Sequence, residues 1–305
     1  MFIGLAQFLF RHCIILPVFH YYNVEPVLSE VQFFLVVLST ILIAAGGYII
    51  NDYFDVKIDQ INKPHRLLVD RIFPRRRAIL ANWIFSVAGI LLGGFVAWWV
   101  GRWHLGGGYV VSSFLLWWYS ANLKRQPLIG NVVVSFLTAL TIVVVALFEI
   151  WILHRPAAYD DPAGAVFTFV LLYGGFAFLI SMVREIVKDI EDVEGDRAHH
   201  CKTLPVVGGV RLAKSVAQVF AGVLAINVVI LLLLEFREDN FLVVGYGVVT
   251  VLVPLLYVIL RLYRADRKRH YHQLSTWIKL IMLMGILSMI MLYYFDEPYK
   301  YFLYD

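Results

Sequence analysis

Residues 31–63 read VQFFLVVLSTILIAAGGYIINDYFDVKIDQINK. The segment Val31–Ile50 has no charged side chain, and as a helix it is long enough to cross a hydrocarbon layer of roughly 30 Å. Three aspartates follow it, Asp52, Asp55 and Asp59. Steps of three and four residues return to one face of an α-helix, so these carboxylates are expected to project together. The stretch therefore predicts a membrane helix that ends in a stripe of carboxylates.

The composition of the whole chain favours the same environment. Of its 305 residues 61% are hydrophobic and 16% are charged, whereas about a quarter are charged in an average soluble protein. We expect an all-α integral membrane protein, a nine-helix bundle that forms a single polytopic domain over residues 1–305. The nine expected spans are Met1–Phe19, Val31–Ile50, Ala78–Val100, Leu105–Ala121, Pro127–Leu153, Pro162–Val183, Ser215–Leu234, Phe241–Leu260 and Leu274–Phe295.

The positions of the basic residues predict the orientation of these spans. Most of the 26 Lys and Arg residues fall in the loops after the second, fourth, sixth and eighth segments. The remaining loops and the C-terminal tail hold only Arg102, Arg155, Arg237 and Lys300. Because cytoplasmic loops carry an excess of positive charge, the N-terminus and these basic loops are expected in the cytoplasm. The first residues lack a basic n-region, so no cleavable signal is expected. We expect the inner membrane of a bacterial cell, with the active site facing the cytoplasm.

Arg11 interrupts the first apolar segment. A charged side chain within a membrane span is costly, and it usually faces the interior of the bundle or reaches back to the interface. Both positions remain open for Arg11 from the sequence.

A second carboxylate cluster lies in residues 184–209, which read REIVKDIEDVEGDRAHHCKTLPVVGG. Asp189, Asp192 and Asp196 repeat the spacing of the first cluster, although Gly195 could end the helix before Asp196. Two such clusters at the cytoplasmic ends of membrane helices could meet across the bundle. Carboxylates of this kind suit Mg²⁺, which completes its coordination with waters and substrate phosphates. The two clusters could then hold Mg²⁺ ions that clamp a diphosphate.

The simpler alternative is that aspartates at helix ends only meet water. The glutamates of this region, Glu185, Glu191 and Glu194, are expected to be solvated or paired with neighbouring bases. The motif His199–Cys201 lacks the paired spacing of a zinc site, and the chain has no CxxC pair.

Basic residues that an anionic substrate would require lie between and beside the two clusters. Arg and Lys donors stabilise phosphate oxygens and a departing diphosphate. The candidates are Lys63, Arg66, Lys124 and Lys202. The alternative is that basic runs such as Arg75–Arg77 and Arg267–Arg269 only orient the helices.

The two clusters resemble the motifs of the UbiA superfamily of intramembrane prenyltransferases. NDYFDVKIDQINKP is similar to its first NDxxDxxxD motif, and DIEDVEGDRAHHCKTLP is similar to its second motif. YSANLKR, at Tyr119–Arg125, resembles the family's segment with a tyrosine and a lysine. The chain departs from many members in NKPHRLLVDR, where a Pro-Ser-Gly segment is often present. The style of the second motif is similar to the branch that includes digeranylgeranylglycerol phosphate synthases and homogentisate-type prenyltransferases, and it looks less like the 4-hydroxybenzoate branch.

The resemblance implies a helical bundle around a central cavity with a lateral opening for a lipid tail. It implies Mg²⁺-dependent transfer of a polyprenyl group from its diphosphate to an acceptor, a prenylglycerol phosphate or an aromatic or quinone precursor. No nucleic-acid partner is expected. The metal ligands it implies, with Asp189 the weaker match, are Asp52, Asp55, Asp59, Asp189, Asp192 and Asp196. The catalytic residues it implies are Asp55, Asp59, Asp192, Asp196, Tyr119 and Lys124, and it places Asn51 at the diphosphate. The bases near the motifs, Lys63, Arg66 and Lys202, are the further candidates for binding the diphosphate.

Two other functions fit parts of the pattern. A secondary transporter would also place acidic residues in a membrane domain, although usually near the midplane rather than at one end. A lipid-binding protein without catalytic activity would not need both sets of carboxylates.

Overall fold

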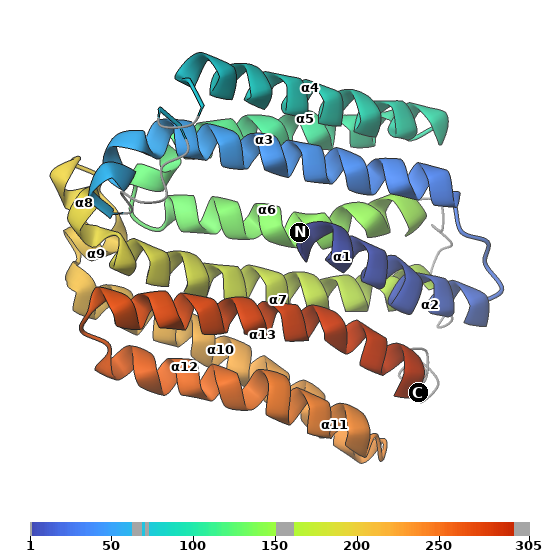
Figure 1. Ribbon diagram of the computed structural model, residues 1–305. Helices are drawn as coiled ribbons and strands as arrows, with labels where there is room; N and C mark the ends of the chain where they lie inside the picture. Colours follow the sequence, from blue (N-terminus) through green and yellow to red (C-terminus); the bar gives the residue numbers. More distant parts are fainter. Residues whose placement is uncertain (1, 63–68, 71–72, 151–161, 296–305) are drawn as a thin grey trace.

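The computed structural model describes residues 2–62, 69–70, 73–150 and 162–295, and this part of the chain is almost entirely helical. The long helices are α3 (Glu30–Asn62), α4 (Arg75–Trp99), α5 (Trp103–Ala121), α6 (Ile129–Ile150), α7 (Pro162–Glu191), α10 (Gly209–Arg237) and α13 (Lys268–Phe295). The shorter ones are α1 (Phe2–Leu9), α2 (Leu16–Tyr21), α8 (Val193–Ala198), α9 (Leu204–Val207), α11 (Phe241–Gly247) and α12 (Val253–Arg264). Figure 1 shows the long helices side by side in a bundle, with α8 and α9 at the end where α3 finishes.

Two of the spans are interrupted by short π-helical turns. Phe10–Ile15 joins α1 to α2, and Val248–Leu252 joins α11 to α12. Pro17 and Pro254 stand at the start of the helix that follows each turn. Proline has no N–H to donate to the carbonyl four residues earlier, and a wider turn is one way for the helix to accommodate this. Each interrupted pair therefore counts as one rod.

Counted in this way, the described residues form nine long rods, as expected. Eight of them are long and apolar enough to cross a membrane, and α5 is the one that is not among the eight. Large apolar side chains such as Phe34, Trp83 and Leu91 are more than 60% exposed on the outside of the bundle. A surface of this kind suits lipid tails and not water. The expectation of an all-α integral membrane bundle is confirmed.

Several helices begin or end away from the expected positions, mainly at the aspartate end of the bundle. Helix α3 continues to Asn62, and α7 continues to Glu191, eight residues past the expected Val183. Helices α10 and α13 each begin six residues earlier than expected, at Gly209 and Lys268. Glu, Lys and Arg are good helix formers, so these helices extend beyond their apolar parts. The expected start at Pro127 is also wrong, because α6 begins at Ile129.

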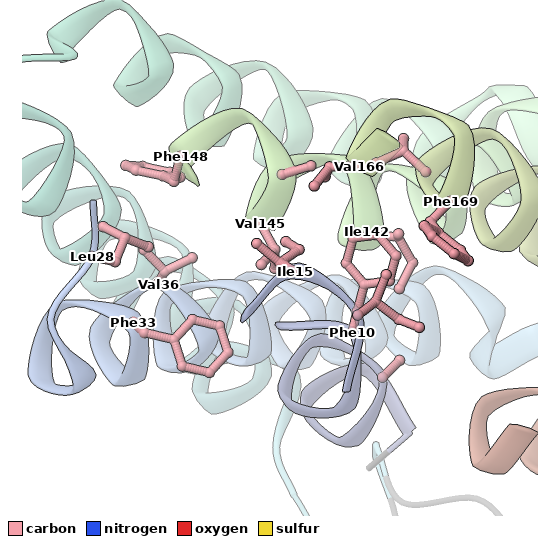
Figure 2. Close-up of a cluster of buried hydrophobic side chains, with 14 of the residues drawn as sticks. Phe10, Ile15, Leu28, Phe33, Val36, Ile142, Val145, Phe148, Val166 and Phe169 are labelled. Atoms are coloured by element: carbon pink, nitrogen blue, oxygen red, sulfur yellow. The ribbon is translucent and has the colours of Figure 1, made fainter. Parts of the chain in front are cut away.

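A buried apolar cluster holds the opposite end of the bundle together. Phe10 and Ile15 of the first rod pack with Phe33 of α3, Phe148 of α6 and Phe169 of α7, and Figure 2 shows these side chains converging. None of the five is more than 4% exposed. A second buried apolar cluster, which includes Ile186 and Ile190 of α7 and Leu262 of α12, packs the part of the bundle nearer the aspartates.

Arg11 lies within this apolar region and is 1% exposed. Its Nε donates to Oε1 of Glu149 at 2.8 Å, and its Nη1 donates to Oε1 of Glu30 at 2.6 Å. Its Nη2 donates to the carbonyl oxygen of Leu28 at 2.5 Å. Of the two positions left open by the sequence, Arg11 therefore takes the interior one.

Candidate active site

The first carboxylate cluster lies on the last three turns of α3. The helix is continuous from the apolar segment to Asn62, so the spacing of Asp52, Asp55 and Asp59 keeps them on one face. The side chain of Asp55 is 19% exposed and Asp59 is half-buried, whereas Asp52 is exposed. Asp55 is the member of the stripe that faces the inside of the bundle.

Asp55 belongs to a three-residue polar contact with Asn51 and Lys124. Asn51 Nδ2 donates to Asp55 Oδ2 at 2.8 Å, and Lys124 Nζ donates to Asn51 Oδ1 at 3.2 Å. Lys124 Nζ also donates to Asp55 Oδ1. Burial lowers the pKa of the Lys124 ammonium, while the charge of Asp55 opposes that shift. A buried cation is thus held directly beside the predicted metal ligand.

The turn that carries Lys124 is fixed by close packing. Lys124 lies in the 3₁₀ turn Leu123–Arg125, between α5 and α6. A Cβ atom at Gly130, near the start of α6, would lie 2.7 Å from Lys124 Cα. Only glycine permits this approach without a shift of the backbone. The close packing against α6 holds the turn in place, and from there the Lys124 side chain reaches Asn51 and Asp55 of α3.

The second cluster is divided between two helices. Helix α7 ends at Glu191, and Asp192 has φ −98° and ψ 7°, so the helix breaks there and not at Gly195. Asp189 remains on α7 and accepts a hydrogen bond from Asn131 Nδ2 at 2.8 Å. Asp196 lies on α8. The expectation that Asp189, Asp192 and Asp196 form one straight stripe is therefore wrong.

Asp196 is 8% exposed, and Thr203 Oγ1 donates to its Oδ2 at 3.0 Å. Burial raises the pKa of Asp196 to about 6. The hydrogen bond from Thr203 acts in the opposite direction, and the charges of Asp192 and Asp55 raise this pKa further. The last effect means that carboxylates from α3 and α8 are close enough to repel one another.

Asn62 links the two clusters. Its Nδ2 donates to the carbonyl oxygen of Asp192 at 2.9 Å, and its Oδ1 accepts from the N–H of Gly195 at 3.1 Å. A Cβ atom at Gly195 would lie 2.5 Å from Asn62 Nδ2, so this contact requires glycine. Lys268 Nζ donates to the carbonyl oxygen of Asn62 at 2.9 Å and adds the start of α13. This one asparagine holds the break after α7 against the end of α3.

A cavity of about 600 Å³ opens beside the first cluster and runs through the bundle. Its polar end includes Asn51, Tyr119 and Arg184, and its walls are largely apolar side chains of α3, α5, α6, α7 and α13. The Tyr119 phenol lies within electrostatic range of Asp55 on α3 and of Glu185 and Arg184 on α7. The cavity thus has the form of a site for a long apolar molecule with a charged head.

The predicted site residues meet to different degrees. Asn51, Asp55 and Lys124 are in contact, and Asp192 and Asp196 stand opposite them. Lys202 is exposed, and its backbone N–H donates to the carbonyl oxygen of Arg125 at 2.8 Å. Lys63 and Arg66 lie outside the described residues.

Three polar residues of the site were missed from the sequence. Asn62, Asn131 and Thr203 each hold a predicted aspartate or its backbone in place. Asn62 and Thr203 stand inside the two quoted motifs, so their polar side chains next to conspicuous acids were the available signal. Asn131 lies in an apolar helix, and nothing in its neighbourhood pointed to Asp189.

Among the described residues, no group of three or more His, Cys, Asp or Glu side chains could hold a metal ion. Mg²⁺ does not need such a group, because it is usually bound by one or two carboxylates together with waters and substrate phosphates. Asp55 and Asp196 offer oxygen ligands from two helices, and Lys124 already balances Asp55 with a positive charge. The donor set fits a divalent cation that arrives with a phosphorylated ligand.

Comparisons with known proteins agree with this description. The model of the UbiA prenyltransferase family matches residues 16–283. The chain is 31% identical over 276 residues to the digeranylgeranylglyceryl phosphate synthase of Methanosphaera stadtmanae, with 89% of each chain covered. It is 41% identical over 186 residues to the synthase of the same name from Methanopyrus kandleri, where the match spans 61% of each chain.

Solved structures show the same fold. An apo structure of a UbiA homologue from Aeropyrum pernix superimposes with a TM-score of 0.66 at 14% identity, over 94% of this chain and 97% of that one. A UbiA homologue from Archaeoglobus fulgidus, bound to DMAPP and Mg²⁺, gives a TM-score of 0.54 at 16% identity, over 94% and 98% of the two chains.

Proposed function

This chain belongs to the UbiA prenyltransferase family, and from that premise we propose that it transfers a prenyl group from a prenyl diphosphate to a phosphorylated glycerol lipid. The observation that carries the proposal is the contact of Asp55 and Lys124 with Asn51, which lines the polar end of an apolar cavity, with the carboxylate of Asp196 within electrostatic range of both. Relatives named digeranylgeranylglyceryl phosphate synthases support geranylgeranyl diphosphate as the donor and geranylgeranylglyceryl phosphate as the acceptor.

The proposed roles of the residues follow from their positions. The apolar walls of the cavity receive the prenyl tail and keep water away from the reacting carbon. Asp55 and Asp196 would hold Mg²⁺, which would supply charge neutralisation for the departing diphosphate. When the donor binds, the Lys124 ammonium gives up its hydrogen bond to Asp55 and donates to a diphosphate oxygen instead. There it stabilises the negative charge that develops as the diphosphate departs. Of the four other predicted ligands, Asp59 and Asp192 would complete the site from the two sides, whereas Asp52 is exposed and Asp189 accepts a hydrogen bond from Asn131.

Tyr119 is the proposed partner of the allylic carbon. When the bond between that carbon and the diphosphate oxygen breaks, the carbon becomes cationic, and an aromatic ring stabilises a cation at its face. Tyr119 lines the cavity, as do Asn51 and Arg184, and it lies within electrostatic range of Asp55. The neighbouring Trp117 and Trp118 are 45% and 41% exposed, which fits membrane-interface residues better than this role.

We propose that the aspartate end of the bundle faces the cytoplasm, because the basic loops lie at that end. The relatives named above are archaeal and do not support the expected bacterial inner membrane. Membership of a prenyltransferase family also disfavours the transporter alternative, and so does the position of the carboxylates on the last turns of α3 and on α8, at one end of the bundle.

The proposal is tested with the purified protein in detergent, labelled geranylgeranyl diphosphate and a panel of acceptors. We expect a prenylated product with geranylgeranylglyceryl phosphate in the presence of Mg²⁺, and none after chelation with EDTA. Restoring Mg²⁺ in excess of EDTA should restore the product. Turnover that continues unchanged in EDTA would contradict the proposed metal dependence, and transfer only to aromatic acceptors would contradict the proposed acceptor.

The raised pKa of Asp196 predicts how Mg²⁺ binding depends on pH. Above about pH 6 the carboxyl group is ionised and available to the metal, whereas below pH 6 a proton must be displaced first. The affinity for Mg²⁺ should therefore fall as the pH decreases through 6, by roughly tenfold per pH unit for one displaced proton. Titrations of Mg²⁺ at several pH values, followed by the thermal stability of the protein, measure this.

The variant Thr203→Val provides the matched control for that titration. It keeps the shape of the side chain and removes the hydrogen bond that favours the ionised form of Asp196. The loss of Mg²⁺ affinity should then begin at a higher pH than in the unmodified protein. An affinity that stays constant from pH 7 to pH 5 would exclude Asp196 as a ligand.

A further inference from the structure

The short helix α8 begins without the cap that its own first residue could supply. Asp192 stands at the N-cap, where an aspartate usually accepts a hydrogen bond from the N–H of the second or third helical residue. The Asp192 side chain makes no such bond. The N–H of Gly195, the third residue of α8, donates instead to Oδ1 of Asn62 at 3.1 Å. An amide from the end of α3, 133 positions earlier in the chain, therefore takes the place of the usual cap.

The side-chain amide of Asn62 is held at both of its ends. Its Nδ2 donates to the carbonyl oxygen of Asp192 at 2.9 Å, and the same oxygen accepts from the N–H of Asp196 at 3.1 Å. The backbone carbonyl of Asn62 is one that α3 cannot pair within itself, and it accepts from Nζ of Lys268 at 2.9 Å. Asn62 is 7% exposed, and together these bonds fix its amide in one orientation.

Close packing at Gly195 supports the same role for Asn62. A Cβ atom at Gly195 would lie 2.5 Å from Nδ2 of Asn62 and 2.8 Å from its Oδ1. The amide could move aside only by breaking one of its hydrogen bonds to the backbone of this turn. Even the side chain of alanine would therefore displace it. Glycine is required at this position for as long as the amide caps α8.

The carboxylates of Asp192 and Asp196 belong to the same turn. They are four residues apart, and the hydrogen bond between their backbones places both on one side of that turn. The charge of Asp192 acts on Asp196, and so does the charge of Asp55 on α3. A carboxylate that accepted the N–H of Gly195 would be committed to that N–H in direction and in charge. Because Asn62 occupies the N–H, α8 does not draw the Asp192 carboxylate into this bond.

We propose that Asn62 is a positioning residue of the metal site, which caps α8 in place of Asp192 and thereby keeps the Asp192 carboxylate for Mg²⁺. The inference rests on the proposed function, in which the carboxylates of α3 and α8 bind Mg²⁺ together with the donor diphosphate. Mg²⁺ requires nearly ideal octahedral geometry, so a carboxylate that turns toward its own backbone is lost as a ligand. Without the amide, the N–H of Gly195 would attract the carboxylate of Asp192, since an N–H in the first turn of a helix requires an acceptor from outside the helix.

The role of Asn62 is tested by titrating Mg²⁺ at a fixed concentration of inorganic diphosphate, with the thermal stability of the protein in detergent as the signal. For Asn62→Ala, we expect the Mg²⁺ concentration at half saturation to rise roughly tenfold to a hundredfold, the usual effect of losing a residue that orients a metal ligand. Gly195→Ala keeps the asparagine but displaces its amide, and it should reproduce the rise.

Asn82→Ala is the matched control for Asn62→Ala. Asn82 is also 7% exposed, and its Nδ2 donates to the carbonyl oxygen of Gly46 at 3.0 Å, between α4 and α3. The variant therefore loses a buried hydrogen bond of the same kind at a place away from the carboxylates. It should lower the melting temperature and leave the half-saturating Mg²⁺ concentration unchanged.

A double variant shows whether Asn62 acts through Asp192. Asp192→Asn removes the carboxylate, so adding Asn62→Ala to it should lower the Mg²⁺ affinity by less than about twofold, whereas independent effects would multiply. A further loss of roughly tenfold or more would overturn the inference, because Asn62 would then act without the Asp192 carboxylate.

Binding and turnover separate this inference from the proposed reaction. In Asn62→Ala, the Mg²⁺ concentration for half-maximal rate should rise, while kcat at saturating Mg²⁺ should change little. If the protein transfers no prenyl group but Mg²⁺ and diphosphate bind more weakly to Asn62→Ala than to Asn82→Ala, the proposed function fails and the positioning role stands. If Asp192→Asn weakens the binding of Mg²⁺ and Asn62→Ala does not, the proposed site stands and the positioning role is overturned.

Discussion

Replacement of Asp55 by asparagine is expected to lower the rate of prenyl transfer by on the order of a thousandfold. Asparagine keeps the size and one oxygen of the side chain but removes the negative charge that a divalent cation requires. It also leaves the ammonium of Lys124, which is 11% exposed, without its counter-charge. Two groups that would act on the departing diphosphate are thus impaired by a single change. The measurement is kcat with saturating donor, acceptor and Mg²⁺.

Asp70→Asn is the matched control for this variant. Asp70 lies at the same end of the bundle, its side chain is 42% exposed, and it pairs with Arg75 at 2.6 Å outside the cavity. Its backbone φ of +68° is also tolerated by asparagine, so the fold should not change. Asp55→Glu retains the charge, and we expect it to keep more activity than Asp55→Asn. The proposed clamp is wrong if a folded Asp55→Asn protein turns over at more than half the normal rate.

The parts of this site that could be predicted are those that depend on neighbours in the sequence. Asp55 and Asp59 share a helix face because their spacing is local, and the long apolar run that precedes them marks a span. The proposed orientation of the bundle rests on the loop charges, which are also a local property. For this reason the fold and the first cluster could be recognised from the amino-acid sequence alone.

The remaining features depend on contacts between distant residues. Asn62 bonds the backbone of a residue 130 positions later, and this contact accompanies the helix break at Asp192. The spacing of three and four residues suggested a straight second stripe, because the periodicity of one segment contains no information on hydrogen bonds to a distant residue such as Asn62.

Replacement of Glu149 by alanine is expected to lower the free energy of unfolding by about 3–5 kcal/mol, the usual cost of removing one partner from a buried ion pair. Glu149 is fully buried, and its Oε1 accepts from Arg11 at 2.8 Å. Its Oε2 accepts from the backbone N–H groups of Val27 at 2.8 Å and Leu28 at 3.3 Å. The change would leave the buried Arg11 short of a charge and two N–H groups without their acceptor. It would also loosen the first rod from α6.

Glu30→Gln is the sharpest control, because Glu30 is the other carboxylate on the same arginine. The side chain of Glu30 is 69% exposed, so its contact with Arg11 at 2.6 Å should contribute only about 0–1 kcal/mol. Unfolding in detergent, followed by the fluorescence of the eight tryptophans, compares the two variants with the unmodified protein. A large loss confined to Glu149→Ala would show that burial, and not the number of ion pairs, decides how firmly the first rod is held. Equal losses for the two variants would mean that Arg11 is not enclosed as described, because an arginine open to solvent would be stabilised similarly by either carboxylate.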